Sequence, residues 1–179
     1  MLHFTRCAMA SLVIAASLVA SPALADEKED LHKVSFIGTQ KAITNPPSPC
    51  SFDKTKTCLT GTATAAVMGR LIGKGTQTVS FNIDLSDATP NGIGGLCFPL
   101  TATVITTAAN GATFDFSAVG PDCATGSSDS GPRTGNLTFF ISGGTRRFKN
   151  ATGSGQVIVG DDGSGNQTVS GHGVLLLPE

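Results

Sequence analysis

The chain alternates apolar and polar residues in short runs, which is the pattern of half-buried β-strands. The clearest run is Thr76 to Leu85, in which Val79, Phe81, Ile83 and Leu85 are separated by polar residues. Seven further runs are bounded by turn residues: Val34 to Ile37, Thr60 to Met68, Phe98 to Val104, Phe114 to Ala118, Leu137 to Ser142, Gln156 to Val159 and Thr168 to Leu177. This pattern predicts an all-β fold, a small antiparallel β-barrel of about eight strands. A two-sheet β-sandwich is the alternative.

The register of one hairpin follows from the sequence. Asn110-Gly111 lies between two of these runs, and this dipeptide is typical of tight hairpin turns because it accepts positive φ angles. If the turn centres on Asn110, Val104 faces Phe116 and the apolar residues of both strands share one face. A shift by one residue would send them to opposite faces. In the favoured register Cys97 lies directly opposite Cys123.

Four cysteines follow the N-terminal apolar segment: Cys50, Cys58, Cys97 and Cys123. An even number of cysteines in an exported chain predicts disulfides. The register pairs Cys97 with Cys123, and elimination pairs Cys50 with Cys58. The cysteine spacings are not those of a zinc site, and the sequence has few histidines to serve as ligands. We therefore predict two disulfides, no metal site and no cofactor.

The first residues have the three parts of a secretory signal. A short segment carrying Arg6 precedes the apolar stretch Cys7 to Ala20, and small Ala23 and Ala25 follow. This arrangement predicts cleavage between Ala25 and Asp26. Residues 1–25 would then be a cleavable signal peptide, and residues 26–179 a single disulfide-stapled barrel domain that is secreted or periplasmic. No later apolar run is long enough for an integral membrane segment.

Composition excludes some partners. The formal net charge is −1, so the chain has no long-range attraction for nucleic acid, and we predict no nucleic-acid partner. Trp and Tyr are absent, so the 10 phenylalanines must supply every aromatic contact. The 22 glycines exceed the usual frequency of about 7%.

One segment carries a family resemblance. Gly143 to Gly155 reads Gly-Gly-Thr-Arg-Arg-Phe-Lys-Asn-Ala-Thr-Gly-Ser-Gly. It resembles an element of the allene oxide cyclase and dirigent type of barrel, whose bacterial exported relatives carry Gly-Gly-Thr-Gly-Arg-Phe and then Gly-Ala-Thr-Gly-Ser-Gly. The resemblance implies the same barrel, with the glycines turning the chain at a corner and Phe148 closing one end. It implies no catalytic residue, because the cyclases' catalytic residues find no matching motif here.

The chain departs from this element in two places. Arg146 replaces a glycine, and Lys149-Asn150 stands where Ala-Gly is common. If position 146 has a positive φ, the arginine costs about 1 kcal/mol of local strain.

Few residues are candidates for chemistry. His172 shares its alternation with Val174 and Leu176, so it is the one titratable side chain expected to point inward and a weak catalytic candidate. Arg146, Arg147 and Lys149 form a basic cluster that could contact an anion. Asp84 and Asp115 fall opposite the apolar faces of their strands and are expected outside. Without an inward acid/base pair, the sequence does not favour an enzyme.

The leading functional hypothesis is an exported non-enzymatic barrel that binds a small hydrophobic ligand or has an envelope-associated structural role. One alternative is a cyclase- or dirigent-like barrel that steers a hydrophobic substrate by shape. Another is a secreted interaction module that uses the long loops Asp87 to Gly95 and Pro121 to Gly135. A phenylalanine-lined cavity of several hundred Å³ would favour a binder or a cyclase, whereas a filled barrel would exclude both. Ligand identity and oligomeric state do not follow from the sequence.

Overall fold

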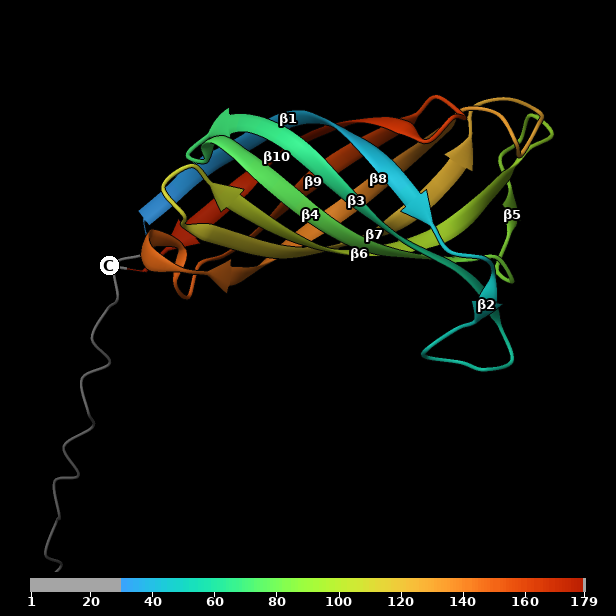
Figure 1. Ribbon diagram of the computed structural model, residues 1–179, viewed down its shortest axis with the longest axis horizontal. Coiled ribbons are helices and arrows are strands. Elements are labelled where there is room, and N and C mark those ends of the chain that lie inside the picture. Colours follow the sequence, from blue (N-terminus) through green and yellow to red (C-terminus); the bar gives the residue numbers. More distant parts are fainter. Residues whose placement is uncertain (1–29, 179) are drawn as a thin grey trace, which may run out of the picture.

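The computed structural model describes residues 30–178, and these form a closed antiparallel barrel (Figure 1). Its strands are β1 (Asp30–Thr44), β3 (Thr57–Arg70), β4 (Gly73–Asp84), β6 (Leu96–Ala108), β7 (Thr113–Ala124), β8 (Arg133–Gly144), β9 (Thr152–Asp161) and β10 (Asn166–Leu177). They follow the order β1-β10-β9-β8-β7-β6-β4-β3, and the β1–β3 pairing closes the barrel. The predicted barrel is therefore confirmed, and a sandwich is not formed.

Two short strands and one helical turn complete the described elements. β2 (Ser48–Pro49) pairs with β3, and β5 (Thr89–Pro90) pairs with β6; both lie at one end of the barrel, on the right in Figure 1. The 3-10 turn η1 (Arg146–Phe148) lies at the other end, between β8 and β9. We call the η1 end the packed end and the β2–β5 end the mouth.

The predicted hairpin register is confirmed. Val104 pairs with Phe116, and Cys97 pairs with Cys123. The strands are longer than their apolar runs indicate: Val34 to Ile37 is only part of β1, which extends for 15 residues. The segment Pro121 to Gly135 is likewise not a single loop, because β7 continues to Ala124 and β8 begins at Arg133. Polar inward residues at the strand ends interrupt the apolar alternation, so the sequence pattern underestimates the strands.

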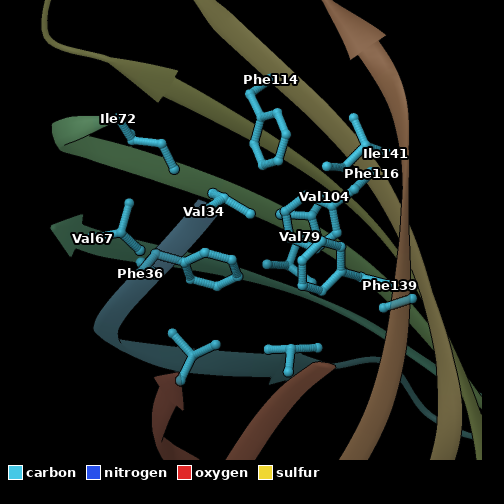
Figure 2. Packing of buried hydrophobic residues seen from close by; sticks show 14 of the residues in the cluster. Val34, Phe36, Val67, Ile72, Val79, Val104, Phe114, Phe116, Phe139 and Ile141 are labelled. Atoms are coloured by element: carbon cyan, nitrogen blue, oxygen red, sulfur yellow. The ribbon is translucent and has the colours of Figure 1, made fainter. Parts of the chain in front are cut away.

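Phenylalanine rings fill the packed end. Phe36 on β1, Phe114 and Phe116 on β7, and Phe139 on β8 point into the barrel interior (Figure 2). The Phe116 ring centroid lies 5.2 Å from that of Phe139 and 5.9 Å from that of Phe36. All four side chains are at most 4% exposed. Such clustered rings bury large apolar areas, so the packed end is the hydrophobic core of the molecule.

Glycines on β9 and β10 make room for these rings. A Cβ atom placed on Gly171 would lie 2.3 Å from Cζ of Phe36, and one on Gly155 would lie 2.6 Å from Cζ of Phe139. A larger residue at Gly171 would therefore require the Phe36 ring to move, and one at Gly155 would also lie 2.2 Å from the main-chain oxygen of His172. Gly173 lies against the Phe139 ring in the same way, so these three glycines have a packing role: they form the wall against which aromatic side chains fill the barrel.

The resemblance element forms the predicted corner. Phe148 is 1% exposed, and its ring centroid lies 5.7 Å from that of Phe114, so Phe148 closes the packed end as expected. Arg146 has a φ of 54°, in the left-handed region where glycine is favoured. The strain expected from an arginine at this position is therefore present.

Both predicted disulfides are formed, Cys50–Cys58 and Cys97–Cys123. Two disulfides indicate that the protein matures in an oxidising compartment. The predicted signal-peptide cleavage site between Ala25 and Asp26 lies outside the described residues.

Candidate functional site: a cup at the barrel mouth

The half of the barrel at the mouth is open. It contains a cavity of about 530 Å³, which we call the cup. The apolar part of its wall includes Val79, Phe81, Ile83, Leu100, Ala102, Leu137 and Val159. These residues come from β4, β6, β8 and β9, on the same inward faces that carry the packed core. The barrel is therefore filled at one end and hollow at the other.

One side of the cup carries a chain of polar side chains on adjacent strands. Gln40 on β1 pairs in register with Gln167 on β10, which pairs with Asp161 on β9. The Gln40 amide donates to the Gln167 carbonyl at 2.6 Å, and the Gln167 amide donates to the Asp161 carboxylate at 2.9 Å. The carbonyl oxygen of Gln40 is buried and accepts no hydrogen bond. All three residues line the cup.

Arg133 on β8 continues this polar side, but its guanidinium is already bound. Its Nε donates to the Asp122 carboxylate at 2.6 Å. Its Nη2 donates to the main-chain carbonyls of Asp122 and Leu96, and its Nη1 donates to that of Asp129. The guanidinium also lies 5.0 Å from the Phe98 ring centroid, within the range of a cation–π interaction.

The rim of the cup is therefore divided. The side formed by β1, β10, β9, β8 and β7 is polar, whereas the side formed by β6, β4 and β3 presents Phe98, Ile83 and Leu59. The charged residues that line the cup are Asp122, Asp129, Asp161 and Arg133, three anions and one cation, so their sum is −2. Chemically, this site can hold an apolar body and direct a polar group toward one side.

The alternation of each strand, continued past its apolar run, places the polar residues of the rim. Asp122 has the same parity as Phe116 and Ala118, and Arg133 has the same parity as Leu137 and Ile141. The sequence prediction missed them because it ended each strand where the apolar residues ended.

The prediction for His172 is wrong in orientation. His172 is exposed, and its neighbour Val174 is 41% exposed, whereas Leu175 is 0% exposed. The inward residues of β10 are therefore the odd-numbered ones. The error has a physical cause: residues 174–177 are all apolar, so this end of the strand has no alternation that indicates its inner face.

The basic cluster lies at the packed end, far along the barrel from the cup. Arg146 donates to the main-chain carbonyl of Asn110, and Arg147 donates to that of Leu71. These bonds tie the β8–β9 corner to the β6–β7 and β3–β4 turns. Lys149 is exposed. An anion contact by these three residues stays a prediction.

Asp84 does not line the cup, as expected for its parity, but it is only 7% exposed because the Cys50–Cys58 segment covers it. Lys56 of that segment reaches the carboxylates of Asp84 at 3.0 Å and Asp87 at 2.7 Å. Burial raises the pKa of Asp84, but hydrogen bonds from Lys56 and from the main chain of Ser86 outweigh it and hold this pKa below its ordinary value. These contacts link the stapled segment to β4 at the mouth.

Among residues 30–178, no group of three or more His, Cys, Asp or Glu side chains is placed to hold a metal ion. Within the same part of the chain, no helix has the length and apolar character needed to cross a bilayer. Comparison with family models, with curated proteins and with solved structures gives no match. The class of protein that the structure defines is a disulfide-linked, closed antiparallel β-barrel with an open cup; kinship with the cyclase and dirigent barrels is not shown.

Proposed function

We propose that this protein binds a small, largely apolar molecule in the cup and works as an exported, non-enzymatic binding protein. The observation that carries the proposal is the half-filled barrel. The cup holds about 530 Å³ between apolar walls, and small-molecule sites in proteins typically measure about 300–1,000 Å³. Burial of a ligand's apolar surface against this wall would supply the driving force for binding.

The titratable groups of the cup support binding over catalysis. Arg133 and Asp122 are engaged with each other, and Asp161 accepts hydrogen bonds from Gly163 and Gln167. Groups held in this way orient the rim and a ligand's polar end. A barrel that steers a substrate by shape alone would use the same cavity, so turnover of the bound molecule is what separates that alternative from simple binding.

Export is part of the proposal. The two disulfides support maturation in an oxidising space, and the segment that ends at Ala25 supports secretion or periplasmic delivery. We expect the intact mass of protein recovered from the extracytoplasmic fraction to correspond to a chain that begins at Asp26. A mass that retains residues 1–25 would contradict this.

The binding proposal is tested by filling the cup. Gly135 lines the cup, and a Cβ atom placed there would meet only ordinary contacts, the nearest at 3.7 Å. Gly135→Leu should therefore fold and occupy ligand space. We expect it to abolish binding of the neutral dye N-phenylnaphthylamine, measured by the gain in dye fluorescence, and to remove any ligand seen in native mass spectra.

The matched control is Asn136→Leu, which adds an apolar side chain on the exposed face of the same strand. It should leave dye binding unchanged. Circular dichroism of both variants verifies the fold. Dye binding that survives Gly135→Leu in a folded protein would place the dye elsewhere and refute the proposal.

A further inference from the structure

The rim of the cup carries hydrogen-bond acceptors in excess of donors, and this imbalance bears on the chemistry of the ligand. We infer that the cup selects apolar molecules with a hydroxyl or amino end and discriminates against those with a carboxylate end. This inference rests on the proposed function. Three features of the rim carry it: the state of its cation, the spare acceptors and the sum of its charges.

The only cation that lines the described cup is already engaged with partners within the protein. A guanidinium has five N–H donors. Four hydrogen bonds from Arg133 go to the Asp122 carboxylate and to the main-chain carbonyls of Asp122, Leu96 and Asp129. One N–H is left, so a two-point bond to a ligand carboxylate would require Arg133 to release one of these acceptors, and release of Asp122 would leave a buried charge without its partner. An anionic head group would therefore compete with an existing ion pair.

Acceptors, by contrast, remain free. An ionised carboxylate offers about four lone-pair sites, and Asp161 uses two of them, at 2.7 Å from the Gly163 amide and 2.9 Å from the Gln167 amide. No cation lies within ion-pair distance of Asp161 among the described residues. A hydroxyl group at this side would donate its one hydrogen to Asp161, and an ammonium group would also form an ion pair with it.

The net charge of the residues that line the cup favours the same ligands. Three carboxylates and one guanidinium line the cup, so the rim is negative by two charges. Low-dielectric walls concentrate such a potential at the opening of a cleft. It would attract an ammonium, leave an alcohol unaffected and repel a carboxylate. With the polar head at Asp161 on β9, the apolar tail would lie against the opposite side, formed by Phe98, Ile83 and Leu59.

The test compares three probes that share one chain and differ in the head group: decylamine, decanol and decanoate at neutral pH. Each probe competes with N-phenylnaphthylamine for binding to the wild-type protein. The probes are kept below the concentrations at which they aggregate. We expect decylamine and decanol to displace the dye at concentrations about tenfold or more below that needed for decanoate. If decanoate competes as well as the other two, or better, the inference is wrong while the binding proposal stands. If none of the three probes competes, the inference is wrong as well; dye binding that survives Gly135→Leu in a folded protein refutes the proposed function itself.

A substitution at Asp161 tests whether its carboxylate is the group that contacts the head group of the ligand. Asp161→Asn keeps an oxygen for the Gly163 amide but removes the charge. We expect this variant to weaken decylamine binding about tenfold and decanol binding less than twofold. The matched control is Asp162→Asn: Asp162 is exposed, does not line the cup, and its pKa is lowered to about 2 by hydrogen bonds from Ser164 and Asn166. An equal loss of decylamine affinity in both variants would refute the role of Asp161.

Discussion

The two ends of this barrel are stabilised by different means. Within residues 30–178, the packed end has no disulfide; phenylalanine rings fill it and lie against glycines of β9 and β10. The mouth has a cavity in place of a core, and there the strands are linked by Cys97–Cys123, by Cys50–Cys58 and by the ion pairs of Lys56 and Arg133. A cavity lacks the dispersion contacts and the apolar burial that a packed core provides. Cross-links supply at the mouth the stability that packing supplies at the other end.

The comparison shows how one strand can serve two purposes. On β7, the inward residues run from Phe114 and Phe116 in the core to Asp122 at the rim. On β8, they run from Ile141 and Phe139 to Arg133. Each strand thus changes from apolar to polar along a single inner face, which permits a packed core and the cup to share one barrel.

The largest difference in stability between the two ends should appear when a leucine is replaced by alanine at each end. Leu175 is fully buried at the packed end, whereas Leu100 is half-buried in the cup wall. Leu175→Ala should lower the free energy of unfolding by about 2–5 kcal/mol, because it leaves a cavity in a close-packed core. Leu100→Ala should cost about 1 kcal/mol, because it only enlarges an existing cavity. Urea denaturation measures both; equal losses would show that the ends do not differ in packing.

Removal of the disulfides should destabilise the mouth. On the loop-entropy model, Cys97→Ala with Cys123→Ala should lower the free energy of unfolding by about 3.5 kcal/mol. The shorter Cys50–Cys58 loop should contribute about 2.6 kcal/mol. Native-state hydrogen exchange should show faster exchange of main-chain amides at the mouth ends of β6 and β7, with amides near η1 unchanged. Uniform acceleration along both strands would contradict a local role for the disulfide.

Glycine packing is tested at the opposite end. Gly171→Ala places a methyl group against the Phe36 ring and should cost about 1–3 kcal/mol by overpacking. Phe36→Leu in the same chain should recover part of that loss, a coupling that a double-mutant cycle measures. Gly126→Ala is the control, since a Cβ atom there meets nothing within 4 Å and should change stability little. Additive losses for Gly171 and Phe36 would show that the ring does not depend on this glycine.

The smallest expected effect is the contribution of Asp84 to the pH dependence of stability in the acid range. Its pKa is lower in the folded protein than its ordinary value, so its stabilising contribution is present above the unfolded pKa of about 3.9 and is lost as the pH falls through the folded pKa. Asp84→Asn should therefore be less stable than the wild type at pH 7, and the difference should shrink below about pH 4. Thermal melts across this range provide the measurement. A difference that persists unchanged at low pH would assign the loss to packing and not to the Lys56 ion pair.

Several features of this protein could be read from its sequence because they depend on neighbours in the chain. Alternation with a period of two located each barrel strand, and the Asn110-Gly111 turn set a register that brought Cys97 opposite Cys123. The same reasoning from neighbouring residues gave the wrong orientation for His172, because residues 174–177 do not alternate.

Only the tertiary structure decided how the barrel interior is used. The lining of the cup and the hydrophobic core each draw residues from all eight barrel strands, so both depend on segments that are distant in the chain. The polar side of the cup brings Gln40 beside Gln167 across 127 positions of the chain. Closure of β1 on β3 and β10 creates that contact, and no local pattern encodes it.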